Sequence, residues 1–139
     1  MDFFSQEWAD ALCEQLNQNQ AYQASAQTWE GSLLLVAYRF ADDTQNPAIL
    51  LDLWHGQCRS ARLCNGAAHN EAEYVLSAKP TDWQTVLNGD IAPLMAVMRG
   101  KLRLLKGSTT TLARYANAAK QIVVSAADVG AAIPEEWLG

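Results

Sequence analysis

A helical pattern of apolar residues stands out in the second half of the chain. Side chains spaced i, i+3, i+4 and i+7 lie on one face of a helix. Four apolar residues have this spacing: Ile91, Leu94, Met95 and Met98. Asp90 can cap such a helix, Pro93 suits its first turn, and Gly100 marks its end. The pattern predicts a helix over residues 90–99 with one apolar face.

Other helices are predicted from caps and spacing. Ser5 precedes an apolar repeat of every fourth residue, which predicts an amphipathic N-terminal helix. Residues 81–84, Thr-Asp-Trp-Gln, have the spacing of a capping box and predict a short helix over residues 82–87. Ser108 can cap a last helix, and the polar stretch 17–27 can hold a weaker one because it has few strong breakers.

Strand signals fill the middle of the chain. Short apolar runs bounded by turn residues predict four strands, at residues 31–40, 48–55, 57–64 and 71–78. The third run ends at Asn65 and Gly66, a favoured turn dipeptide, so we expect a four-strand meander. A fifth run, residues 101–106, alternates Leu102 and Leu104 with Lys101 and Arg103.

The order of these elements determines the fold class. A helix, four strands, two short helices, one strand and a last helix indicate an α+β domain without an internal repeat. The fifth strand follows two helices, so we expect it to rejoin the sheet through a crossover that leaves the helices on one face. A gap between the helices and the sheet can then hold a ligand.

Composition and charge fit a single domain over residues 1–139. Half of the residues are apolar, enough for a core that needs no disulfides. With 10 basic and 15 acidic residues, the net charge of −5 argues against a nucleic-acid partner and against general affinity for anionic membranes. Residues 99–120 nevertheless carry six cations and no acidic residue. That run predicts either a solvated face or a patch that attracts an anionic headgroup.

The cysteines and the N-terminus predict a cellular location. Three cysteines without CxxC spacing indicate neither a disulfide framework nor a zinc site, so a reducing compartment is expected. The N-terminus lacks the basic region and long apolar run of a secretory signal. The longest apolar run, residues 33–38, is far too short to span a bilayer. The sequence predicts a cytoplasmic protein without stable membrane insertion.

Candidate catalytic and metal-binding residues are few. His55 and His69 have no partner at a recognised metal-ligand spacing. Asp52, His55 and Cys58 can be imagined as a nucleophile set, but they straddle a turn at Gly56, which is a poor arrangement for catalysis. We therefore expect no enzyme activity, no cofactor and no metal.

Residues 83–108 resemble the signature of sterol carrier protein type 2 (SCP-2 sterol-binding) domains. The shared order is an aromatic helix, a glycine, a proline-containing helix, Gly-Lys-Leu, an alternating strand, a second glycine and a last helix. These places are held by Trp83, Gly89, Pro93, Ala96, Met98, Gly100, Lys101, Leu102, Leu104 and Gly107. Ser108 stands where the family often carries an acidic cap, and it caps equally well. The resemblance implies a five-stranded, mostly antiparallel sheet covered on one face by helices, with an apolar tunnel between them.

The resemblance also implies a function. That function is non-catalytic binding, sequestration or transfer of a hydrophobic ligand, such as a fatty acyl chain, acyl-CoA, phospholipid, sterol or isoprenoid. The expected lipid-binding residues are Trp83, Leu87, Ile91, Leu94, Met95, Met98, Leu102 and Leu104. Lys101 and Arg103 are candidates for contact with a headgroup.

Other functions stay open. Within the same family, the chain can be an accessory protein that presents polyprenylated quinone intermediates to enzymes. A small-substrate enzyme would need a convergent acid/base pair, which the sequence does not reveal. A protein-interaction domain finds its best support in the C-terminal pair Trp137 and Leu138. The expected partners are a lipid or other hydrophobic small molecule and lipid-metabolising enzymes.

Overall fold

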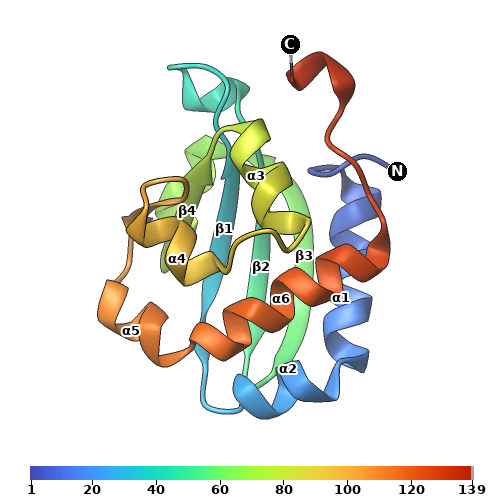
Figure 1. Cartoon of the computed structure of the whole chain (residues 1–139), viewed down its shortest axis with the longest axis vertical. Helices are drawn as coiled ribbons and strands as arrows, with labels where there is room; N and C mark the ends of the chain where they lie inside the picture. The colour runs from blue at the N-terminus through green and yellow to red at the C-terminus, as the bar shows by residue number, and fades with distance from the viewer. Residues whose placement is uncertain (139) are drawn as a thin grey trace.

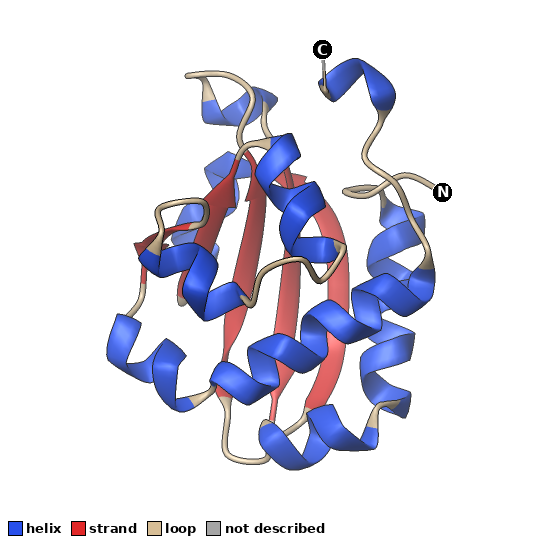
Figure 2. Cartoon of the chain, viewed as in Figure 1, coloured by secondary structure: helices blue, strands red, loops and turns tan. Residues whose placement is uncertain are grey.

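The computed structural model describes residues 1–138. The helices pack on one face of a sheet (Figure 1, Figure 2). The five strands lie in the order β3-β2-β1-β4-β5. Their bounds are β1 Glu30–Ala37, β2 Pro47–Trp54, β3 Gln57–Asn65, β4 Tyr74–Ala78 and β5 Arg103–Lys106. The expected α+β class with a mostly antiparallel sheet is confirmed.

One pairing differs from the predicted four-strand meander. Strands β1, β2 and β3 are antiparallel neighbours, but β4 pairs with β1 and runs parallel to it. Asn65 and Gly66, the expected turn after β3, do not form a hairpin turn. The Asn65 side chain instead accepts a hydrogen bond from the N–H of Ala67 at 2.8 Å and begins the 3-10 helix η2, Gly66–Glu71. The crossover therefore lies between β3 and β4, whereas β5 returns antiparallel beside β4.

The α-helices follow the predicted order with different starts. They are α1 Gln6–Gln18, α2 Gln20–Ser25, α3 Pro80–Leu87, α4 Pro93–Met98, α5 Thr109–Arg114 and α6 Ala116–Val129. Ser5 and Ser108 cap α1 and α5 as predicted, because their hydroxyls accept from backbone N–H groups at 3.2 and 3.3 Å. The last predicted helix is split in two at Tyr115.

The predicted caps of the two middle helices are wrong. Thr81 lies inside α3, and Asp90 lies outside α4, whose preceding residue is Ala92. Neither helix has a side-chain cap. Both begin at a proline, which has no N–H to satisfy and whose fixed φ already suits a first helical turn.

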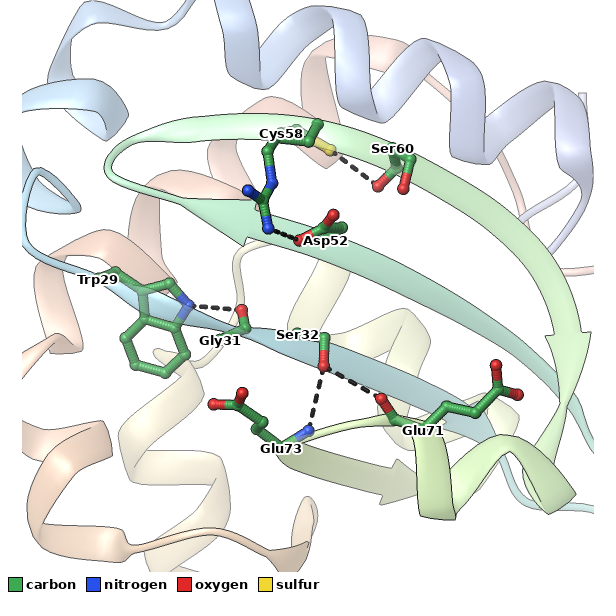
Figure 3. Close-up of polar contacts among 9 residues, drawn as sticks. Trp29, Gly31, Ser32, Asp52, Cys58, Ser60, Glu71 and Glu73 are labelled. Atoms are coloured by element: carbon green, nitrogen blue, oxygen red, sulfur yellow. Dashed lines mark hydrogen bonds and ion pairs between the residues drawn. The ribbon is translucent and has the colours of Figure 1, made fainter.

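Alternation along the strands divides the sheet into two faces. On the helix-covered face, every second residue joins the main core, as Leu33, Leu35 and Ala37 do in β1. On the other face, Leu34 and Val36 belong to a smaller apolar cluster that includes Ala68 from η2. Ser32 of β1 connects this strand to η2, because its hydroxyl donates a hydrogen bond to the Glu71 carbonyl and accepts one from the Glu73 N–H (Figure 3). The helix-covered face holds most of the core.

Candidate functional site

A cavity lies between the sheet and the helices, near the start of β1 and the end of β2. Its volume is about 40 Å³, room for more than one water-sized group but not for a lipid chain. Its walls come from α2, β1, β2, β4, β5, α5 and α6. The lining residues are Tyr22, Ala26, Trp29, Leu33, Leu53, Tyr74, Leu76, Leu104, Leu112, Tyr115, Ala118, Ala119 and Ile122. The tunnel implied by the resemblance stays a prediction.

Three aromatic rings form one wall of this cavity. The ring of Trp29 lies 4.7 Å from that of Tyr74 and 4.9 Å, edge to face, from that of Tyr115, centre to centre. The Trp29 indole donates to the carbonyl of Gly31 at 2.9 Å, which fixes its orientation (Figure 3). The Tyr115 hydroxyl lies 2.7 Å from that of Thr28, so a hydrogen bond joins the α5–α6 junction to the segment before β1.

Two glycines make room for the ring of Tyr74. A Cβ atom on Gly107 would lie 2.3 Å from Tyr74 Cδ1, closer than any real contact, and the φ of Gly107 is +112°. A Cβ atom on Gly31 would lie 3.2 Å from Tyr74 Cε2. Gly107 is also the second glycine of the signature, so the structure gives that position a role in placing a cavity wall.

The cavity is electrically neutral. Among the described residues, no charged side chain lines it. Tyr22 brings a hydroxyl into its lining, and burial raises the pKa of this hydroxyl above its ordinary value, so the phenol stays uncharged. Such a space favours the apolar body of a ligand and disfavours a buried charge.

The structure places the predicted lipid-binding residues in three environments. Of the eight, only Leu104 lines the cavity. Trp83, Leu87 and Leu102 are buried in the core, where the Trp83 indole donates to the carbonyl of Val36 at 2.8 Å. Ile91, half-buried, packs against the core from outside α4.

The other three predicted residues lie in a shallow groove. Leu94, Met95 and Met98 line it with residues of α6, and Met98 is 70 % exposed. Because α4 is only six residues long and starts at Pro93, its buried positions are Pro93 and Ala96. The predicted apolar stripe is therefore turned outward. Whether these eight residues bind lipid stays a prediction.

The remaining cavity residues were missed by sequence reasoning. They come from six elements and the residues between them, and each looks like ordinary core in its own segment. In residues 71–78, alternation puts Tyr74 and Leu76 on one strand face, and both line the cavity. Nothing in the sequence shows that a gap lies opposite that face.

The candidate headgroup residues lie away from the cavity. Lys101 and Arg103 are exposed and do not line it. The Lys101 ammonium lies 3.8 Å from a carboxylate oxygen of Asp82 in α3. Their contact with a headgroup stays a prediction.

Across residues 1–138, no hydrogen bond joins the members of the imagined nucleophile set. His55 contacts Glu30, and Asp52 pairs with Arg59 at 2.9 Å. The Cys58 thiol donates to the Ser60 carbonyl, and burial raises its pKa above the ordinary value, so it stays protonated and a poor nucleophile. Within residues 1–138, no three His, Cys, Asp or Glu side chains are grouped to hold a metal ion.

The C-terminal segment and the helices bear on two further expectations. Trp137 packs on the chain itself, with its ring 6.3 Å from Phe4 and 5.0 Å from the guanidinium of Arg39. Its aromatic surface is thus partly used internally. In the part of the chain that the structure describes, no helix has the length and apolarity needed to cross a membrane.

The chain matches a known protein family and several solved structures. The sequence model of the SCP-2 sterol transfer family matches residues 9–120. The chain belongs to the SCP-2 sterol transfer family. A crystal structure of sterol carrier protein 2 is 45 % identical, with a TM-score of 0.83 over 90 % of this chain and 97 % of that one. A conserved hypothetical protein from Thermus thermophilus, described as possibly a sterol carrier protein, is 44 % identical, with a TM-score of 0.84 over 97 % and 94 %.

More distant SCP-2 structures share the fold alone. The ubiquinone synthesis protein UbiJ-SCP2 is 15 % identical, with a TM-score of 0.51 over 82 % of this chain and 86 % of that one. No curated protein matches the chain. The SCP-2 domain is generally a non-catalytic fold that binds lipids and other hydrophobic molecules.

Proposed function

We propose that this SCP-2 domain binds the apolar part of a lipid, such as a fatty acyl chain, in the cavity beneath α5 and α6. One observation carries the proposal: an apolar cavity remains at this end of the core, whereas the rest of the core is filled. Each methylene removed from water contributes about 0.8 kcal/mol, so an acyl chain gains affinity with every carbon that enters. A broad ligand range follows, because apolar walls discriminate weakly between similar chains.

The cavity must widen to take a chain. The elements suited to this movement are those above it, because α5 has only six residues and the helix breaks at Tyr115. Opening there requires the Tyr115 hydroxyl to leave Thr28 and the Trp29 ring to leave Tyr115. These are a hydrogen bond at the surface and an aromatic contact, which are weak compared with the buried core.

The proposal includes transfer or presentation of the ligand rather than its chemical conversion. A neutral cavity without a convergent acid/base pair supports holding a ligand and gives no reacting group. The predicted cytoplasmic location and lipid-metabolising partner enzymes belong to the same proposal, as does the single-domain organisation of residues 1–139.

The test is binding to delipidated protein. We expect fluorescent fatty acids or acyl-CoA to bind at micromolar levels, and native mass spectrometry of fresh protein to show a copurified lipid that solvent extraction identifies. Loss of binding across acyl, isoprenoid and sterol probes would contradict the proposal.

A paired variant experiment separates the cavity from the predicted α4 site. Ala118 lines the cavity, whereas Met95 lies in the outer groove. If the cavity is the site, Ala118→Leu lowers lipid uptake and Met95→Trp leaves it unchanged. The opposite result would return the site to the apolar residues of α4.

A further inference from the structure

An unusual surface lies outside the cavity, on the segment from α4 to the start of α6. Residues 91–120 contain six cations and no acidic residue, whereas the rest of the chain has four cations and all 15 acidic residues. This segment runs through α4, β5, α5 and the start of α6, gold to orange in Figure 1. The protein is therefore acidic as a whole but has one basic segment.

Apolar side chains protrude beside some of these cations. Met98, the neighbour of Arg99, is 70 % exposed, and Met95 is 42 % exposed. Met95 and Met98 also line the groove between α4 and α6, which Lys120 borders.

Most of the cations on this surface are free to act on a partner. Of the six, one has an ion pair within residues 1–138, Lys101 with Asp82 at 3.8 Å. The other five are Arg99, Arg103, Lys106, Arg114 and Lys120, and none of them is buried. The nearest acidic residue in sequence, Asp90, precedes the segment.

From this arrangement we propose that the face formed by α4 and the start of α6 docks on an anionic lipid surface. Cations at the rim attract acidic headgroups, and unbranched methionine side chains can enter the layer beneath them. Elsewhere the negative charge of the protein opposes such contact, so the docked orientation is defined. A lipid surface fits this face better than an acidic protein does, because the exposed methionine side chains are few and protrude rather than forming a flat patch.

The test is flotation of the full chain with vesicles. We expect binding to vesicles of equal parts phosphatidylcholine and phosphatidylglycerol, little binding to phosphatidylcholine alone, and loss of binding as salt is raised. Arg99→Gln with Lys120→Gln should weaken binding at least about tenfold, since each cation near an anionic surface contributes roughly fivefold. The matched control, Arg59→Gln with Arg62→Gln on β3, removes the same charge elsewhere and should leave binding nearly unchanged.

A second pair of variants tests the apolar contact. Met98→Ser should weaken vesicle binding by about tenfold, near the lower end of what burial of a methionine side chain contributes. Leu63→Ser, at an exposed leucine on β3, should have little effect. Equal losses in target and control variants, or equal binding to neutral vesicles, would overturn the proposal. Binding to polyglutamate without binding to anionic vesicles would also overturn it and indicate an acidic protein partner.

Docking and ligand binding are separate readouts. The proposal does not need the cavity to hold a lipid, because vesicle flotation reports only the outer face. Fatty-acid binding by the Arg99 and Lys120 variants in solution should equal that of the parent. Loss of vesicle binding with intact fatty-acid binding therefore concerns this face alone.

Discussion

The two ends of the helix-covered face use similar residues but pack them differently. Near the end of β1, Phe4 lies between Trp8 and Trp83, with ring centres 5.4 and 5.7 Å away, and all three side chains are almost fully buried. Near the start of β1, Trp29, Tyr74 and Tyr115 are in equally close contact but border a cavity of about 40 Å³. Aromatic content thus does not by itself indicate whether a region is core or binding site.

The difference comes from which elements meet. At the closed end, α1, α3 and the chain termini bring bulky side chains together, and Phe3 donates its N–H to the carbonyl of Ala132. At the hollow end, α6 presents the small residues Ala118 and Ala119 toward the sheet. Small side chains on a short helical roof leave a gap that the neighbouring rings do not fill.

The largest expected effect is at the closed end. Trp83→Ala should lower the free energy of unfolding by about 3–5 kcal/mol, because it leaves a cavity and the Val36 carbonyl loses its indole donor. Urea denaturation measures this loss. If the loss were below about 1 kcal/mol, this end would not be close-packed and the contrast with the hollow end would fail.

A matched pair of enlargements tests the contrast directly. Ala96 is a fully buried residue of α4 that does not line the cavity, whereas Ala118 of α6 does line it. Ala96→Leu should cost about 1–3 kcal/mol through overpacking. Ala118→Leu should change stability by less than about 0.5 kcal/mol while reducing lipid uptake, because the added carbons occupy existing space. Thermal midpoints and fatty-acid titrations give both values, and equal destabilisation by the two variants would contradict a hollow end.

A smaller effect is expected at the edge of the cavity. Tyr115→Phe removes the hydroxyl that contacts Thr28 but keeps the ring packed on Trp29. The loss of stability should be about 0.5–1 kcal/mol, the lower part of the range for one hydrogen bond, because the contact is exposed. Bound fatty acid should dissociate faster in stopped-flow measurements. Thr28→Ala serves as the partner variant in a double-mutant cycle, and unchanged dissociation in both would exclude this contact as a barrier to ligand exchange.

The smallest effect on stability is expected at Met95, which lies outside both ends of the helix-covered face. Met95 is 42 % exposed in the groove between α4 and α6. Met95→Trp should change stability by less than about 0.5 kcal/mol, as most exposed substitutions do. Calorimetry measures it, and a large loss would show that α4 is packed more tightly than its exposure indicates.

Sequence by itself determined the elements and the family. Strand alternation, the caps at Ser5 and Ser108, and the signature over residues 83–108 depend on local spacing, which the chain carries explicitly. The α+β class and the five strands follow from these signals. The position of Gly107 was part of the signature, although its reason, space for the Tyr74 ring, was not visible.

Tertiary structure alone decided the strand order and the cavity. Asn65 and Gly66 suit a hairpin turn by local preference, but they begin a 3-10 helix that leads to β4, and β4 pairs with the distant strand β1. Packing also decided which face of α4 is buried: Pro93 and Ala96 face the core, whereas Met95 and Met98 are exposed. The cavity is a gap between residues from distant segments, and a gap has no residue of its own to leave a pattern in the sequence.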